Sequence, residues 1–203
     1  MPDRRDWSLE PAQILSVDDV YSGFGQIERV RFRRMSRAGA PVTQDWEVYR
    51  RADCAAVLPY DPTRRTVLLI RQFRVPAFIN GGRCALVEAC AGLIDAGETP
   101  EACAIREAQE ECGYRLTVLE PAGTYYTSPG ALTERVHLFL ARYTPHDRVS
   151  DGGGQAHEHE DIETFEVSTL ELARMMDDGR IENAITGLLA RALQVKQPGL
   201  FRP

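Results

Sequence analysis

The sequence predicts an α/β fold of the α+β kind, in which a mixed β-sheet lies between helices and follows a small N-terminal antiparallel β-hairpin region. The order of the elements supports this class. Strand patterns fill the first half of the chain, a single helix pattern interrupts them, and two helix patterns close the chain. The length of 203 residues suits one sizeable domain with a small appendage.

Composition restricts the classes of partner. A formal net charge of −6 argues against nucleic acid. It leaves room for a phosphorylated small molecule, because a bound metal reverses the local field. No apolar run reaches the length of a membrane span, so we expect no membrane partner. The first ten residues lack the apolar core of a signal peptide, and this predicts a cytoplasmic protein with five reduced cysteines.

Residues 1–50 are predicted to form the N-terminal β region. The run IERVRFRRM after Gln26 alternates as a half-exposed strand does, and VTQDWEVYR repeats the pattern after turn residues. A hairpin of this size cannot build a strong core. It must therefore pack on the rest of the chain or on a second subunit.

Residues 51–197 are predicted to form the main domain. Strands are expected at CAAVLPY and at TVLLIRQF, which is apolar on both faces as a central strand is. A loop with Pro76 then leads to a short strand, ALVEACAG. Two strands, LTVLEPAGTYY and RVHLFLARY, flank a loop from Thr127 to Glu134.

The end of the chain holds a glycine-containing loop and two helices. The loop from Pro145 to His159 precedes a strand near DIETFEV. Ser168, followed three residues later by Glu171, is a capping box that opens a helix. The last helix is expected from about Asn183 to Gln197.

The segment GLIDAGETPEACAIREAQEECGY, from Gly92 to Tyr114, combines a helix with an excess of acids. Thr99 is a suitable N-cap, Pro100 suits the first helical position, and Gly113 suits the end. Its acids are Glu98, Glu107, Glu110 and Glu111, and only Arg106 offsets them.

Glu107, Glu110 and Glu111 share one helix face, since Glu110 and Glu111 lie three and four positions after Glu107. Like charges at this spacing destabilise a helix by roughly a few tenths of a kcal/mol each. A solvated acidic face is one interpretation. A bound hard cation is the other, because Mg²⁺ takes carboxylate oxygens, phosphate and water as ligands.

The segment has a fixed spacing of residues. Gly92 is followed after five residues by Glu98, and after seven more by Arg-Glu-x-x-Glu-Glu-x-Gly and the apolar Tyr114. This spacing resembles the Nudix box, the signature of Nudix hydrolases. The resemblance implies the Nudix fold. Outside the box, LLIRQFR, SPG and HEHEDIE are similar to the subfamily that hydrolyses ADP-ribose and other nucleoside diphosphate sugars. The likeness covers roughly residues 40 to 195.

The resemblance implies a metal site for Mg²⁺, with Mn²⁺ as a possible substitute. The implied ligands are the Ala91 carbonyl and the carboxylates of Glu107, Glu111 and Glu160. Glu158 matches the general base, although Glu158 and Glu160 could exchange roles. The neighbouring histidines allow zinc, but the oxygen donors around them favour magnesium.

The same resemblance implies supporting and substrate-binding residues. Structural support is expected from Gly92, Glu98, Arg106 and Glu110. Substrate contacts are expected from Arg74, Glu134, Trp46 and Glu47, with Trp46 stacking on a purine or packing within the hairpin. The family loop usually reads SPGG, and Ala131 stands in place of its second glycine. If that position needs positive φ, alanine costs about 1 kcal/mol there.

The implied function is Mg²⁺-dependent hydrolysis of a nucleoside diphosphate sugar by a homodimer with exchanged N-terminal strands. ADP-ribose, giving AMP and ribose 5-phosphate, is the first candidate. GDP-mannose, giving GMP and mannose 1-phosphate, is the alternative, because the IRQFRV, CAGL and GGG segments are similar to that enzyme too. A module that only senses nucleotide sugars is a third hypothesis. Such modules usually lose box acids, and this box keeps them all.

Overall fold

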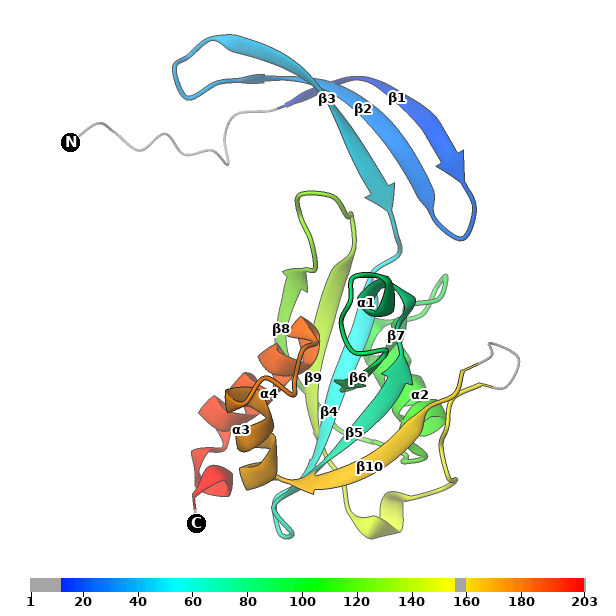
Figure 1. Cartoon of the computed structure of the whole chain (residues 1–203), viewed down its shortest axis with the longest axis vertical. Helices are drawn as coiled ribbons and strands as arrows, with labels where there is room; N and C mark the ends of the chain where they lie inside the picture. The colour runs from blue at the N-terminus through cyan, green and yellow to red at the C-terminus, as the bar shows by residue number, and fades with distance from the viewer. Residues whose placement is uncertain (1–11, 156–159, 203) are drawn as a thin grey trace, which may run out of the picture. The chain divides into compact units, whose positions relative to one another are not determined.

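The structure is a computed structural model that describes residues 12–155 and 160–202. The chain divides into two compact units (Figure 1). The first unit comprises residues 1–52 and 126–134, and the second comprises residues 53–125 and 135–203. Each unit is described separately below.

The first unit contains a three-stranded antiparallel sheet with the order β1-β2-β3. Its strands are β1 (Gln13–Ser22), β2 (Gln26–Met35) and β3 (Pro41–Arg50). The predicted hairpin of β2 and β3 is confirmed, whereas β1 is an additional strand. Its pairing with β2 shifts register between Ile14 and Ser16 and again between Asp19 and Tyr21. These irregularities break the period of two that identifies a strand from sequence.

This sheet has almost no buried interior. Among the described residues, no hydrophobic side chain of β1–β3 is buried, and Val17 and Val20 remain 47% and 49% exposed. The buried charge is Glu28, whose Oε1 accepts a hydrogen bond from Arg50 Nε at 2.7 Å. A small sheet without a covered face is only marginally stable in water.

Segment 126–134 joins the first unit through main-chain pairing with β3. The Tyr49 N–H donates to the Ala131 carbonyl at 2.8 Å, and the Thr133 N–H donates to the Tyr49 carbonyl at 3.2 Å. Arg65 is the only non-glycine residue with positive φ in the described part of the chain. Ala131 therefore carries no left-handed strain, and the substitution in the SPG loop has no backbone cost.

The second unit is built on a mixed sheet, as predicted, with the order β10-β5-β4-β9-β8. The strands are β4 (Cys54–Asp61), β5 (Thr66–Phe73), β8 (Leu119–Tyr126), β9 (Arg135–Arg142) and β10 (Glu163–Ser168). β4 pairs in parallel with β9, whereas β5 pairs antiparallel with β4 and β10. β4 and β5 thus lie inside the sheet, which explains their continuous apolar character.

Two predictions around the next segment are wrong. The loop expected near Pro76 contains a short helix, α1 (Val75–Ile79), because proline suits the first turn of a helix. The single strand expected at ALVEACAG is two strands, β6 (Ala85–Glu88) and β7 (Cys90–Leu93). They separate at Ala89, where the chain steps from pairing with β5 to pairing with β4.

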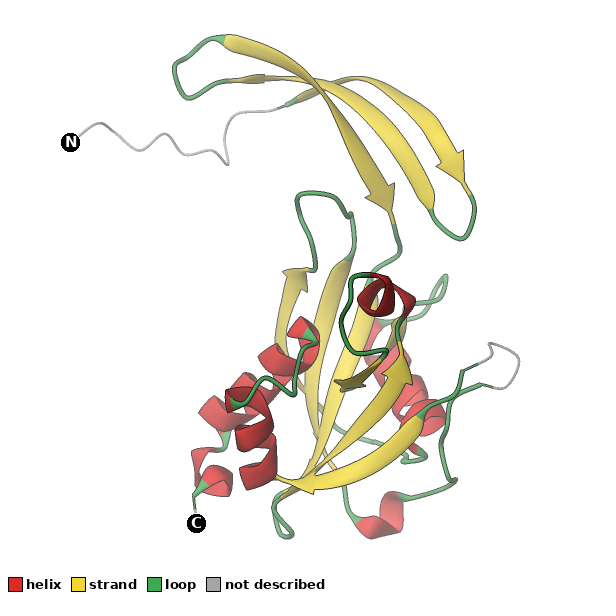
Figure 2. Ribbon diagram, in the orientation of Figure 1, coloured by secondary structure: helices red, strands yellow, loops and turns green. Residues whose placement is uncertain are grey.

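Helices cover both faces of the mixed sheet (Figure 2). α2 (Pro100–Cys112) packs on one face, and α3 (Thr169–Asp177) and α4 (Ala184–Lys196) pack on the other. Alternation along β5 divides its side chains between these layers, with Leu68 and Ile70 toward α2 and Leu69 toward α3 and α4. Two short 3₁₀ helices, Pro145–Asp147 and Pro198–Phe201, complete the elements. No helix in the described ranges is both long and apolar enough to cross a membrane.

The predicted helix ends are confirmed. Thr99 Oγ1 accepts from the Ala102 N–H at 3.2 Å, and Gly113 ends α2 with φ of 78°. Ser168 caps α3 and Asn183 caps α4 through their side-chain oxygens. These caps fix where each helix begins and therefore which side chains face the sheet.

Replacing Gly187 by Ala is expected to stabilise the protein by roughly 0.5–1 kcal/mol, because alanine loses less backbone entropy within a helix. Gly187 lies inside α4, and an added Cβ would meet no heavy atom within 4 Å. Urea unfolding measures the change. Gly113→Ala is the contrasting variant and should destabilise, since φ there is +78° and the new Cβ would lie 2.3 Å from the Ser150 carbonyl oxygen.

Candidate active site

The acidic segment places two carboxylates between β7 and α2. Glu107 and Glu111 lie on the inner face of α2 and are only 9% and 1% exposed. Glu111 Oε2 accepts a hydrogen bond from the Ala91 N–H at 3.0 Å. Gly92 lies so close to Glu107 that an added Cβ would stand 1.9 Å from Glu107 Oε1. Glycine at this position thus leaves the space that the Glu107 carboxylate occupies.

Arg106 of the same helix forms hydrogen bonds with several of the box acids. Its Nε and Nη2 donate to the two oxygens of Glu98, each at 3.0 Å. Its Nη1 donates to Glu107 Oε1 at 2.6 Å and to Glu110 Oε2 at 3.1 Å. A further bond from Nη2 reaches the Leu93 carbonyl at 3.2 Å, which ties the helix to the end of β7. One guanidinium thus contacts three of the four box acids.

The two inner carboxylates resist ionisation. Burial raises the pKa of Glu107 to about 7, although the charge of Arg106 opposes this rise. Burial also raises the pKa of Glu111 well above its usual value, and repulsion from Glu107 adds to the effect. Two buried carboxylates that repel each other need a compensating cation when both are ionised.

Glu160 and Arg74 belong to the same electrostatic environment. The charge of Glu160 contributes to the raised pKa of both inner glutamates. Glu160 Oε2 accepts from the Gln155 N–H at 2.9 Å, which orients the carboxylate. Arg74 has Glu88 as its hydrogen-bonded acidic partner, and the charges of Glu111 and Glu160 act on it as well.

The predicted general base, Glu158, lies outside the described residues, as do His157 and His159. Within the described ranges, no three His, Cys, Asp or Glu side chains form an assembled metal site. Glu107 is instead turned toward Arg106, and Glu111 is bound to the Ala91 N–H.

The donor chemistry nevertheless fits a hard divalent cation. Every predicted ligand supplies oxygen, from the Ala91 carbonyl or from Glu107, Glu111 and Glu160. Buried carboxylates with pKa values raised by burial and repulsion are the groups that a divalent cation would stabilise in their charged form.

The other predicted substrate residues belong to the first unit. Trp46 Nε1 donates to the Gly130 carbonyl at 2.8 Å, which joins β3 to the SPG loop. Glu134 accepts from Thr127 Oγ1 at 2.9 Å and pairs with Arg51 at 3.4 Å. Glu47 lies on β3 opposite Arg29 in the strand register. Trp46 and Glu134 thus belong to the same unit, in which Trp46 contacts the SPG loop and Glu134 lies at the end of segment 126–134.

The expectation of five reduced cysteines is wrong for one pair. Cys90 and Cys112 form a disulfide between the start of β7 and the end of α2. The sequence shows no CxxC spacing, and only the packing of α2 against the sheet brings these residues together. Among the described residues, Cys54, Cys84 and Cys103 take part in no disulfide.

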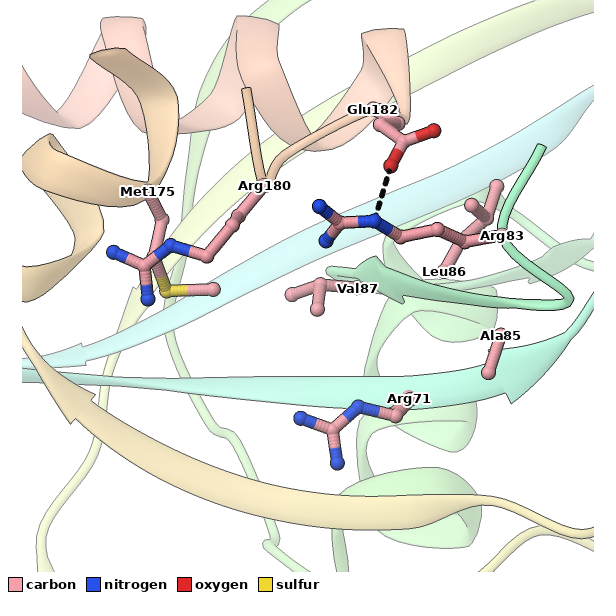
Figure 3. A pocket seen from close by; sticks show the side chains of 8 residues that line it. All are labelled: Arg71, Arg83, Ala85, Leu86, Val87, Met175, Arg180 and Glu182. Carbon is pink, nitrogen blue, oxygen red and sulfur yellow. Dashed lines mark ion pairs between the residues drawn. The ribbon is translucent and has the colours of Figure 1, made fainter. Parts of the chain in front are cut away.

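A cavity of about 220 Å³ lies on the sheet face covered by α3 (Figure 3). Arg71, Arg83 and Arg180 line it, and none of the predicted site residues does. Each guanidinium already has an acidic partner. Arg83 pairs with Glu182 at 3.1 Å, Arg180 pairs with Glu171 at 2.7 Å, and Arg71 pairs with Glu163. The cavity therefore offers no surplus of positive charge to an anion.

Gly92→Ala is expected to weaken the binding of Mn²⁺, used here as a spectroscopic probe, by roughly 10–100-fold, as loss of ligand support typically does. The added methyl group would displace Glu107, because the space it needs is occupied by that carboxylate. Titration followed by electron paramagnetic resonance measures the affinity. Gly199→Ala, whose Cβ would meet nothing within 4 Å, is the control. An unchanged affinity in Gly92→Ala would contradict this account of the site.

Metal-free protein should lose stability as the pH rises from about 4.5 to about 7. Folded Glu107 keeps its proton until about pH 7, whereas the unfolded chain releases it near the ordinary value of 4.5. The folded state binds more protons in this window, so a rising pH favours unfolding. Urea unfolding in EDTA across this range measures the trend. Glu107→Gln should flatten it, and an identical pH dependence in the variant would refute the assignment.

Comparison with known proteins places this site in a family. Residues 50–184 match the family described as NUDIX domain. A GDP-mannose pyrophosphatase of Cronobacter sakazakii (strain ATCC BAA-894) is 42% identical over 171 residues, which cover 84% of this chain and 88% of the relative. Proteins of the same name from Pectobacterium atrosepticum and Escherichia coli (strain K12) are 45% and 38% identical, over 74% and 90% of this chain and 77% and 95% of their own lengths.

The fold is also similar to a solved structure. The crystal structure of an ADP compounds hydrolase aligns with a TM-score of 0.73 and covers 98% of this chain and 100% of its own, at 20% identity. This likeness shows the fold. The family match and the sequence relatives, together with the arrangement of the acidic helix against β7, show that this protein belongs to the Nudix hydrolase family.

Proposed function

We propose that this Nudix hydrolase cleaves the diphosphate linkage of a nucleoside diphosphate sugar with Mg²⁺, for which Mn²⁺ can substitute. The buried pair Glu107 and Glu111 is the observation that carries the proposal. A diphosphate cannot approach carboxylates without cations between them, and these carboxylates need a cation to ionise together.

Glu107, Glu111, Glu160 and the Ala91 carbonyl would hold the metal. When bound, Mg²⁺ supplies neutralisation of phosphate charge and a more acidic water. Glu158 would take the proton from the attacking water, and this assignment rests on its place in the sequence. Arg106 orients the carboxylates of Glu107 and Glu110 by donating to both, and Arg74 would donate hydrogen bonds to diphosphate oxygens.

GDP-mannose is the first substrate to test, giving GMP and mannose 1-phosphate. The relatives that cover most of this chain bear the name GDP-mannose pyrophosphatase. ADP-ribose, giving AMP and ribose 5-phosphate, is the second candidate, because LLIRQFR, SPG and HEHEDIE resemble the ADP-ribose subfamily. These relatives therefore move GDP-mannose ahead of the substrate that the sequence favours. The intact set of box acids weighs against a module that only senses nucleotide sugars.

The first unit is proposed to contribute specificity within a homodimer. The exposed apolar residues of β1 support this, since such a surface in a small sheet calls for a partner. Trp46, Glu47 and Glu134 would contact the nucleoside or sugar. Trp46 is 46% exposed, and its indole ring suits stacking on a purine.

The experiment that decides the substrate is a screen of nucleoside diphosphate sugars with product identification. Release of GMP from GDP-mannose should exceed release of AMP from ADP-ribose, and EDTA should stop both. The opposite ranking would favour the ADP-ribose assignment. Binding without turnover in the presence of Mg²⁺ would instead support the sensing module.

Glu111→Gln should fold normally yet lose more than the roughly 10–100-fold in turnover that removal of a merely supporting residue costs. The amide cannot supply the buried negative charge, although it can still accept the Ala91 N–H bond. Steady-state kinetics with Mg²⁺ measures the loss, and thermal unfolding verifies the fold. Glu101→Gln, an exposed acid in the first turn of the same helix, is the matched control and should keep its activity. Full activity in Glu111→Gln would overturn the proposed site.

A further inference from the structure

The guanidinium of Arg74 is held along one edge by a buried acid, Glu88. Arg74 Nη2 donates to Glu88 Oε2 at 2.6 Å, and Arg74 Nε donates to the same oxygen at 3.1 Å. Glu88 is 4% exposed, whereas the Arg74 side chain is 40% exposed. Arg74 Nη1 donates no hydrogen bond to any described residue, so its two N–H groups are available to a ligand.

Glu88 is itself oriented by the N-cap of α4. Asn183 Nδ2 donates to Glu88 Oε1 at 3.0 Å. The other end of the same amide, Asn183 Oδ1, accepts from the Thr186 N–H at 3.0 Å and from Thr186 Oγ1 at 3.1 Å. Thr186 Oγ1 in turn accepts from the Ala89 N–H at 2.9 Å. These bonds form a closed circuit between the β6–β7 step and the first turn of α4.

These hydrogen bonds fix Glu88 and thereby determine which acid pairs with the guanidinium of Arg74. Glu111 and Glu160 both attract Arg74 electrostatically. Pairing with Glu88 is the alternative to pairing with these carboxylates, which the proposed function needs for a cation. Glu88 supplies that competing anion at short distance and with two donor contacts, which is the stronger form of arginine–carboxylate pairing.

We propose that Glu88 and Asn183 are positioning residues for the reaction. They hold Arg74 away from the metal-binding carboxylates and leave one edge of its guanidinium free for the diphosphate of the substrate. The inference rests on the proposed function, because it assigns the free edge of Arg74 to that substrate. The sequence alone does not indicate this role for either residue. An acid at the end of a strand and an asparagine at a helix N-cap are both common for structural reasons alone.

A double-mutant cycle separates positioning from plain stabilisation. Asn183→Ser keeps an N-cap oxygen but removes the amide donor to Glu88, and Glu88→Gln removes the competing charge. Each variant should raise KM for the preferred nucleotide sugar by about tenfold, with a smaller change in kcat. In an Arg74→Ala background the same changes should have no further effect on KM, because the residue they position is absent.

The control is the ion pair between Arg71 of β5 and Glu163 of the adjacent strand β10, which lies outside the proposed site. Glu163→Gln removes the partner of Arg71 and should leave KM unchanged with or without Arg74. Additive effects of Glu88→Gln and Arg74→Ala on KM would overturn the positioning role while leaving the proposed function intact. Thermal unfolding of every variant identifies any that fails to fold, in which case the Asn183→Ser cycle decides.

A binding experiment tests the same coupling without turnover. Calorimetry with inorganic pyrophosphate and Mg²⁺ should show weaker binding in Asn183→Ser than in the wild type, and no difference between the two in the Arg74→Ala background. Wild-type protein that binds pyrophosphate with this coupling but cleaves no nucleotide sugar would reject the proposed function alone. Equal pyrophosphate affinity of Asn183→Ser and wild type would reject the positioning role.

Discussion

The second unit depends on one electrostatic constraint, which is that α2 carries more carboxylates than the adjacent cations can balance. Arg106 contacts Glu98, Glu107 and Glu110, and it cannot also serve Glu111. The helix must therefore be held by other means. Its caps fix its ends, its small residues pack against β4 and β5, and Gly92 lets β7 approach Glu107 closely. The charge that remains uncompensated is the basis of the metal site that we propose.

Much of the fold could be predicted because most elements carry their own signals. Thr99, Gly113 and Ser168 mark helix ends through local hydrogen bonds, and β4 and β5 show the apolar runs of interior strands. The exceptions have physical reasons. The bulges of β1 break its alternation, α1 is too short to show a helical period, and the break at Ala89 depends on which strand each half pairs with.

The site could be predicted only in part. Glu107, Glu110 and Glu111 can be identified from their helical spacing on α2, and the resemblance to a family adds their roles and that of Glu98. Glu88 and Asn183 could not be found in this way, because their link joins residues 95 positions apart in the sequence. The disulfide between Cys90 and Cys112 was missed for the same reason, since tertiary packing brings the two sulfurs together.

The division of the chain into units has a consequence for biosynthesis. β3 leaves the ribosome early, yet Arg51 donates its N–H to Thr133, which lies 82 residues later. Closing a loop of that length costs conformational entropy. This cost falls when the residues between Arg51 and Thr133 fold first, because the loop that remains to be closed is then shorter. Formation of the β8–β9 pair shortens this loop and makes segment 126–134, which connects the two strands, available for pairing with β3. The N-terminal sheet is thus translated first and receives its last backbone partners only after α2 and β8 have been made.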